Sequence, residues 1–157
     1  LSDLLAQGIG QAVNAVGGIG QIAPRLEVFE RLRAAGFLFP AVFHPSAVIE
    51  PSAELAGGVQ VFAQAYVGTG SQAGFGCIIN TGAIVSHDCV LGDYVNLSPG
   101  AILAGAVTVG ERALIGMGVT VNLEVNIGAG ARIGNGATVK ADVPEGAIVR
   151  AGSVWPE

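Results

Sequence analysis

The stretch INTGAIVSHDCVLGDYVNLSPGAILAGAVTVGERALIGMGVTV, residues 79–121, places an aliphatic residue at every sixth position. The series extends from Ile49 to Val139 without a change of register, and fifteen of its sixteen positions hold Ile, Leu or Val. A small or medium residue lies two positions before each, as Ala83 lies before Val85. A period of six fits neither an amphipathic α-helix nor a simple alternating strand, so another architecture must account for it.

A six-residue period is typical of a coil with three flat sides, in which each hexapeptide forms one short strand and one corner. Three hexapeptides make a turn of about 18 residues, and successive turns stack as parallel sheets about 4.8 Å apart. The aliphatic residue is then often followed by glycine, as at Gly92 and Gly110, and glycine suits corners that need a positive φ. We therefore predict a mostly β fold, a parallel β-helix over residues 47–143 with about five coils and capped ends.

The sequence before residue 44 lacks this period. AVNAVGGIG, residues 12–20, predicts a buried strand and a glycine turn, and APRLEVFERLRAAG, residues 23–36, predicts a helix. FLFPAVF, residues 37–43, predicts another short strand. Strand, helix, strand is the order of a partial α/β (Rossmann-like) fragment. We therefore expect an α/β domain over residues 1–43 and a β-helix domain over residues 44–157 that ends in a C-terminal cap.

The composition limits the partners of this chain. Its 157 residues carry a net charge of −5, with 51% apolar and 12% charged residues. Nucleic-acid and anionic membrane surfaces need clustered Lys and Arg, and a membrane span needs about 18 consecutive apolar residues. We expect neither kind of partner and, without a signal-like start, a cytoplasmic location. So little charge indicates a surface partly buried against other subunits.

His87 is the main candidate for chemistry. It lies two positions after an inward aliphatic residue, so its side chain is expected to point outward, either as a solvated surface residue or as a working base. Asp88 adjoins it, Asn80 lies one hexapeptide earlier and Asn96 follows nine residues later. A carboxylate beside an imidazole fixes its tautomer and raises its basicity, as a general base requires. Adjacent strand residues face opposite ways, so Asp88 reaches His87 only if the corner turns both outward.

The other candidates favour structural roles. His44 precedes Pro45 at the junction with the first coil, where a structural role is favoured over a catalytic one. Cys77 and Cys89 occupy inward corner positions and are expected to be small core residues in a reduced protein. A zinc site of the γ-type carbonic anhydrase kind needs three converging imidazoles, which two distant histidines do not supply. We therefore expect no metal.

Three segments carry a family resemblance: FPAVFHPSAVIEPSAEL (39–55), the stretch 79–121 quoted above, and IGNGATVKADVPEG (133–146). Together they resemble the sugar acyltransferases of the hexapeptide-repeat superfamily. The branch is the one that contains sialic acid O-acetyltransferases and N-acetyltransferases of nucleotide-linked 4-amino sugars. Its pattern of Asn, six residues, then His, Asp or Glu, and Cys is matched by NTGAIVSHDC. The resemblance spans residues 38–147.

The resemblance implies a left-handed β-helix and a homotrimer with active sites between subunits. It also implies acetyl-CoA as co-substrate and a nucleotide-linked sugar or sialic acid as acceptor. It makes His87 the general base and Asp88 the residue that orients it. Asn80 then lies close to the acceptor, and Asn96 is the second expected substrate-binding residue.

The same resemblance assigns the cofactor residues. Gly105 matches a glycine whose backbone amide lies near the thioester carbonyl, while Met117 and Gly134 would line the groove for the pantetheine arm. Two departures stand out. AGSVWPE, residues 151–157, replaces a strand that helps such enzymes hold CoA, and family members carry a glycine-rich first strand before the AVNAVGG segment.

The expected function is direct transfer of an acetyl group from acetyl-CoA to an amino or hydroxyl group of the acceptor. The alternative is a β-helix that serves assembly without chemistry. Such scaffolds fill their outward positions uniformly, whereas the outward residues around His87 are irregular and polar. This contrast favours the enzyme.

Overall fold

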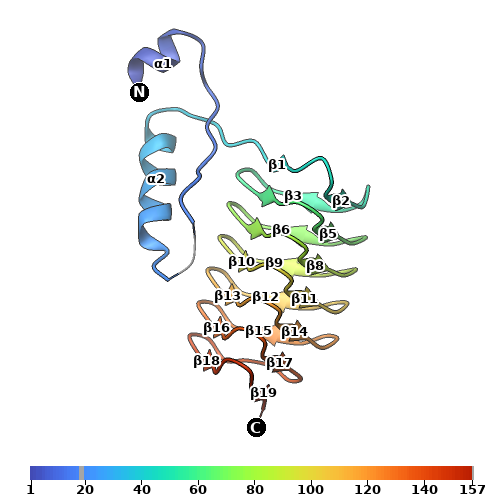
Figure 1. Cartoon of the computed structure of the whole chain (residues 1–157). Coiled ribbons are helices and arrows are strands. Elements are labelled where there is room, and N and C mark those ends of the chain that lie inside the picture. The colour runs from blue at the N-terminus through green and yellow to red at the C-terminus, as the bar shows by residue number, and fades with distance from the viewer. Residues whose placement is uncertain (18–19, 157) are drawn as a thin grey trace.

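The computed structural model describes residues 1–17 and 20–156. Within them the chain forms two short helices and three parallel sheets, wound as a left-handed parallel β-helix of about six turns (Figure 1). The predicted fold class is confirmed, with one turn more than the hexapeptide series indicated. No helix in the described ranges is long and apolar enough to cross a membrane.

The strands are two residues long and pair with strands one turn away. Sheet 1 contains β1 (Val42–Phe43), β4 (Gln60–Val61), β7 (Ile78–Ile79), β10 (Asn96–Leu97), β13 (Leu114–Ile115), β16 (Arg132–Ile133) and β18 (Ile148–Val149). Sheet 2 contains β2 (Val48–Ile49), β5 (Tyr66–Val67), β8 (Ile84–Val85), β11 (Ile102–Leu103), β14 (Thr120–Val121), β17 (Thr138–Val139) and β19 (Val154–Trp155). Sheet 3 contains β3 (Glu54–Leu55), β6 (Gln72–Ala73), β9 (Val90–Leu91), β12 (Thr108–Val109) and β15 (Asn126–Ile127).

The interior is the hexapeptide series itself. Each aliphatic member from Val61 to Val139 is at most 4% exposed, and the small residues two positions earlier are equally buried. Both Cys77 and Cys89 point inward as predicted and are free. Each layer thus packs on the layers above and below it, and stability depends on neighbouring turns rather than on a separate core.

Two different corner positions restrict the residue type. Glycine directly after the aliphatic residue has an ordinary φ, and its missing Cβ allows close approach of the next turn. A Cβ on Gly92 would lie 2.7 Å from the Glu111 nitrogen. Positive φ occurs two positions further on, at Gly82 and also at non-glycine residues such as Asp88. The prediction had not separated these two positions.

The last turn is shorter than the others. Earlier turns pair residues 18 apart, whereas Arg132 pairs with Ile148 and Thr138 pairs with Val154, a spacing of 16. The corner between Val139 and Val143 is two residues shorter than its equivalents, which keeps the later strands in register, so the segment expected to be a short cap forms β18 and β19 instead.

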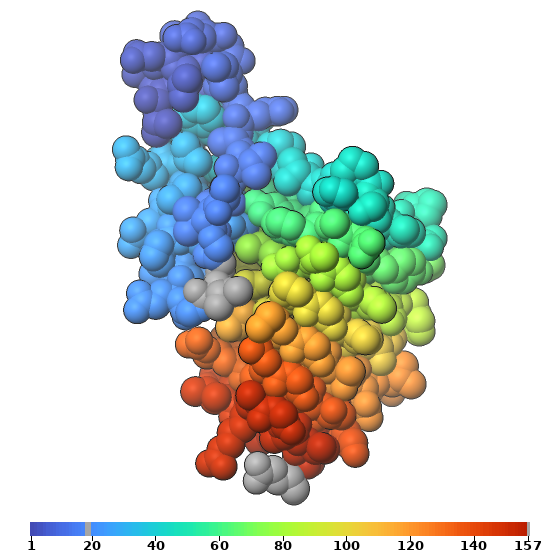
Figure 2. Space-filling view, viewed as in Figure 1, coloured from blue at the N-terminus to red at the C-terminus, as the bar shows by residue number. Residues whose placement is uncertain are grey.

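The N-terminal segment packs beside sheet 1. Helices α1 (Ser2–Ala6) and α2 (Ala23–Ala34) precede the β-helix, and α2 is the helix that the sequence predicted. The buried Phe29 ring lies 5.0 Å from the rings of both Phe39 and Phe75, which fixes α2 against the corner between sheets 3 and 1. Figure 2 shows this segment lying against the side of the stacked turns and extending beyond the first of them.

The predicted strands of this segment are only partly present. A single parallel bridge joins Gln11 to Leu38, and β1 belongs to sheet 1, so the β-helix begins two residues before the expected boundary. The prediction of a buried strand over residues 12–20 is wrong for its described part, because Val13 and Val16 are exposed. A two-stranded sheet stabilises itself poorly. Residues 18 and 19 of that prediction lie outside the described ranges.

Candidate active site

His87 lies at the corner between sheets 2 and 3, called the histidine corner here and made by residues 86–89 and their equivalents one turn away. The chain leaves β8, turns, and returns as β9. Asp88 adopts a left-handed conformation with φ of 57° and donates its backbone N–H to the Thr69 carbonyl. This conformation removes the alternation that would send the two side chains apart. The His87 Nδ1 atom lies 2.8 Å from Asp88 Oδ2, so the condition set by the sequence is met.

This contact defines the chemistry available to the imidazole. An ionised carboxylate only accepts hydrogen bonds, so Nδ1 carries the proton and Nε2 has a free lone pair. The side chains of His87 and Asp88 are 62% and 66% exposed. A molecule from solution can therefore reach Nε2 directly, which a general base requires.

Gly105 lies one turn below His87 and touches its ring. A Cβ built on Gly105 would overlap the Cε1 and Nε2 atoms of the imidazole, so only glycine leaves the ring in place. The Ala106 N–H donates to the His87 carbonyl at 2.9 Å and fixes the spacing of the two turns. The backbone of residue 105 thus lies beside the atom that would accept a proton.

The Gly105 N–H has no acceptor among the described residues. At two equivalent corner positions the side chain 18 residues later supplies one: Asp93 Oδ1 accepts from the Phe75 N–H at 2.7 Å, and Asn135 Oδ1 accepts from the Met117 N–H at 2.9 Å. The residue 18 positions after Gly105 is Leu123, which has no acceptor. The structure therefore leaves a free backbone donor next to Nε2, as sites that stabilise a developing oxyanion require.

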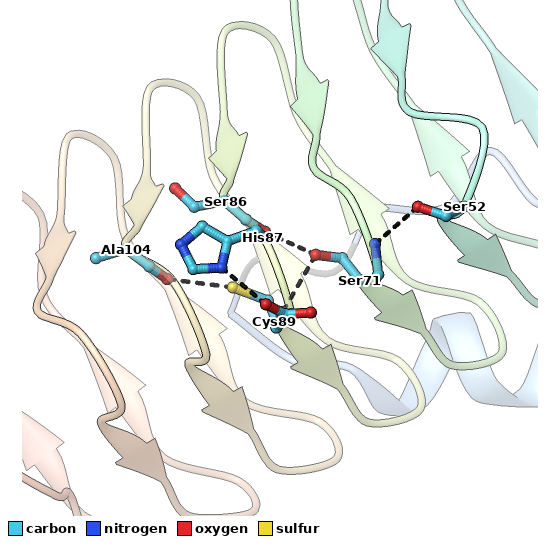
Figure 3. Close-up of polar contacts among 8 residues, drawn as sticks. Ser52, Ser71, Ser86, His87, Cys89 and Ala104 are labelled. Atoms are coloured by element: carbon cyan, nitrogen blue, oxygen red, sulfur yellow. Dashed lines mark hydrogen bonds and ion pairs between the residues drawn. The ribbon is translucent and has the colours of Figure 1, made fainter.

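A buried serine supports the corner from the turn above (Figure 3). Ser71 Oγ donates to the Ser86 carbonyl at 2.6 Å and accepts from the Cys89 N–H at 3.1 Å, so it ties the chain on both sides of His87. Cys89 Sγ donates to the Ala104 carbonyl at 3.2 Å. Sequence reasoning missed Ser71 as a supporting residue, although its hydroxyl at an otherwise small apolar position was a signal. Burial raises the pKa of the Cys89 thiol, which makes it a poor nucleophile.

A second group of expected site residues lies at another corner. Asn80, Met117 and Gly134 all occupy the corner between sheets 1 and 2, called the methionine corner here and made by residues 80–83 and their equivalents in later turns. Met117 is half exposed, and a groove lined by Met117, Gly134 and Ile148 runs along this corner. The width of sheet 2 separates this group from His87, so a single chain does not bring the two groups together.

The remaining candidates lie elsewhere. Asn96 is buried on the outer side of sheet 1, away from the histidine corner. His44 closes a local turn, with its Nδ1 accepting from the Ser46 N–H at 3.2 Å. No cluster of three or more His, Cys, Asp or Glu side chains suited to a metal occurs in residues 1–17 and 20–156.

Solved structures resemble this chain closely, while no protein-family model matches it. A histidine-to-asparagine variant of perosamine N-acetyltransferase from Caulobacter crescentus, in complex with CoA and GDP-perosamine, is 38% identical with a TM-score of 0.89. The match covers 94% of this chain and 69% of that one.

Two further structures agree. The acetyltransferase domain of PglB from Neisseria gonorrhoeae, in complex with acetyl coenzyme A, is 35% identical over 89% of this chain and 72% of that one, with a TM-score of 0.82. WeeI from Acinetobacter baumannii is 30% identical over 80% and 62%, with a TM-score of 0.78. Fold, repeat and identity together show that this chain belongs to the hexapeptide-repeat sugar acetyltransferases.

Proposed function

We propose that this protein transfers the acetyl group of acetyl-CoA to an amino group of a nucleotide-linked sugar, with His87 as general base. The observation that carries the proposal is the arrangement at the histidine corner. An oriented and exposed imidazole with a free Nε2 lies beside the buried Gly105, whose N–H has no acceptor among the described residues. Membership of a sugar acetyltransferase family gives this arrangement its reaction class.

In the proposed reaction His87 Nε2 accepts the proton that the acceptor amine loses as its nitrogen attacks the thioester carbonyl. The Gly105 N–H donates a hydrogen bond to the carbonyl oxygen as negative charge develops there. The carbon–sulfur bond then breaks, and the imidazolium returns the proton to the leaving sulfur. Asp88 holds the ring and stabilises the imidazolium between these two transfers.

The complete site, in this proposal, forms between subunits of a homotrimer. Each histidine corner would then lie next to the methionine corner of a neighbour, which brings Met117 and Gly134 beside the pantetheine arm and Asn80 near the acceptor. The exposed side chains of Met117 (51%) and Leu123 (65%) support this arrangement, because large apolar groups at two corners favour coverage. A sedimentation mass equal to that of a single chain would contradict it.

The relatives support one class of acceptor. The perosamine N-acetyltransferase structure contains GDP-perosamine, a nucleotide-linked amino sugar. We propose an acceptor of the same class, which makes N-acetylation the favoured reaction over O-acetylation. A cytoplasmic location, where acetyl-CoA is made available, completes the proposal.

Thiol release from acetyl-CoA tests the function. The acceptors are a panel of nucleotide-linked 4-amino sugars and free sialic acid. Release should depend on one amino-sugar acceptor and fall by about 10² to 10⁴ in His87→Ala, because general base catalysis contributes a factor of that size. His44→Ala removes the other histidine, which lies outside the corner, and should keep full activity. Undiminished release in His87→Ala would sink the proposed mechanism.

A further inference from the structure

The peptide that joins Ala104 to Gly105 has a different environment at each of its two ends. Its N–H, on Gly105, lies beside the His87 ring and has no acceptor among the described residues. Its carbonyl, on Ala104, accepts a hydrogen bond from the buried Cys89 thiol, with Sγ 3.2 Å from the oxygen (Figure 3). A peptide unit is planar, so a contact that fixes the carbonyl also fixes the direction of the N–H.

The thiol is the only donor to the Ala104 carbonyl within the described part of the chain. At several corners the equivalent carbonyl accepts a backbone N–H three residues later, as Gly110 does from Ala113 at 3.3 Å. Ala104 accepts no such backbone bond from the described residues. Loss of the Cys89 side chain would therefore leave both ends of this peptide without a partner, and its plane would be free to tilt.

Cys89 is itself held in place by buried hydrogen bonds. It is fully buried, and its N–H donates to Ser71 Oγ at 3.1 Å. The Ser71 hydroxyl donates in turn to the carbonyl of Ser86, the residue before His87. Burial raises the pKa of the Cys89 thiol, so at neutral pH the sulfur keeps the proton that it donates. Ser71 and Cys89 thus link the peptide before His87 to the peptide before Gly105.

We propose that Cys89 is a positioning residue for the oxyanion donor: its thiol holds the Ala104–Gly105 peptide so that the N–H is directed at the reacting carbonyl oxygen. The contact also polarises the peptide, because hydrogen bonds in series strengthen one another. Cys89 forms no bond to the substrate and takes no proton in this role. The proposal rests on the proposed function, and it adds a residue on which the Gly105 donor depends.

Cys77 makes the same contact at a corner without an imidazole. Its Sγ donates to the Gly92 carbonyl at 3.1 Å, and it is as fully buried as Cys89. Both histidines of the chain lie at other corners. Cys77→Ala and Cys89→Ala therefore remove the same atoms and the same kind of hydrogen bond. The two variants should lose similar stability, so a difference in catalysis between them reports on position and not on folding.

Steady-state kinetics of acetyl transfer test the proposal on the intact protein. In Cys89→Ala, kcat should fall about three- to ten-fold, a part of the factor of about 10² to 10³ that an oxyanion donor contributes. KM for acetyl-CoA should stay close to the wild-type value, because the affected hydrogen bond strengthens only in the transition state. Cys77→Ala should keep the wild-type kcat and show a similar fall in thermal midpoint. Equal kcat in the two alanine variants would overturn the proposal.

Two further variants separate the lost donor from lost packing. Cys89→Ser should retain most of kcat, because Ser71 shows that a hydroxyl at the equivalent position makes the same contact. Cys89→Val has no donor but fills the space, as the buried Val95 and Val107 do at equivalent positions. Its kcat should fall as in Cys89→Ala. A valine variant as active as the serine variant would show that packing alone is required, and would contradict the proposal.

The amide resonance of Gly105 in a nuclear magnetic resonance spectrum needs no sugar acceptor, so it separates this proposal from the proposed function. The resonance should move in Cys89→Val and stay at its wild-type position in Cys77→Ala. An inactive wild-type protein whose Gly105 resonance moves in Cys89→Val would contradict the proposed catalysis and support the peptide contact. An unmoved resonance in Cys89→Val would overturn the positioning role, whatever the activity.

Discussion

The histidine corner and the methionine corner are built on the same backbone, yet they differ in one hydrogen bond. At the methionine corner Asn135 accepts from the Met117 N–H, so the backbone donor is used within the protein. At the histidine corner the equivalent residue is Leu123, and the Gly105 N–H stays free. Other corners, such as those of Glu111 and Leu123, also leave this N–H without an acceptor among the described residues. The histidine corner differs from them because its free donor lies beside an oriented imidazole.

Leu123→Asn should remove the difference between the free Gly105 N–H and the bonded Met117 N–H. Of the variants considered in this comparison, it should have the largest effect on acetyl transfer. An amide at position 123 would accept from the Gly105 N–H as Asn135 does from Met117. Loss of one oxyanion donor lowers kcat by about 10² to 10³. Acetyl transfer is measured together with the thermal midpoint, which should not fall because a hydrogen bond is gained. Leu123→Met keeps the apolar surface and should retain activity. Equal turnover in Leu123→Asn would show that the Gly105 donor is not used.

Asp88→Asn should have the next largest effect. Asparagine tolerates the left-handed backbone and keeps the shape, but it removes the charge that holds the Nδ1 proton. Acetyl transfer should fall about ten-fold or more, within the range that acid–base catalysis contributes. The matched control is Asp93→Asn, at the corner between sheets 3 and 1, where the side chain caps the Phe75 N–H and an amide can do the same. An unaltered rate in Asp88→Asn would remove the carboxylate from the mechanism.

Much of this comparison was accessible from the sequence. The hexapeptide position fixes which way a side chain points, so an inward Cys89 and an outward His87 followed from counting. The sequence did not show that Asp88 has a positive φ, because most corners use glycine there. The buried position of Asn96 also escaped prediction, since it depends on packing of the N-terminal segment against sheet 1.

The strands expected in the N-terminal segment show where prediction from a local sequence pattern fails. The apolar residues Val13 and Val16 indicated a buried strand, but an isolated pair of strands is only marginally stable. In the described structure those side chains are exposed. Likewise, the hexapeptide position cannot show whether Asn80 and Met117 belong to the same site as His87. Within one chain, sheet 2 separates their corner from the histidine corner.

Asn135→Leu makes the opposite change to Leu123→Asn, because it removes a side-chain acceptor from a corner. Its expected effect is on the stability of the fold. The Met117 N–H would lose its acceptor but remain near solvent, so the free energy of unfolding should fall by about 0.5–1 kcal/mol. Chemical denaturation measures this change. Asn122→Leu replaces an exposed asparagine without a side-chain hydrogen bond in the described structure and should have no such effect. Equal losses in both variants would mean that the cap contributes nothing.

The smallest expected effect is the reactivity of the two cysteine thiols in the interior of the β-helix. Burial raises the pKa of Cys77 to about 12 and also raises that of Cys89. Only the thiolate reacts with disulfide reagents, so at pH 8 the native protein should give almost no colour with them. Both thiols should react after unfolding in guanidinium. Rapid reaction of the native protein would show that these layers open, and would also disturb the thiol-release assay.

The constant pairing of residues 18 apart has a consequence for how such a chain can change in length. Removing a single residue within the β-helix would rotate every later aliphatic side chain out of the interior. Removing or adding 18 would delete or duplicate one whole layer and leave all other contacts as they were. The length of the β-helix can therefore change only by whole turns or, as between Val139 and Val143, by the shortening of a corner.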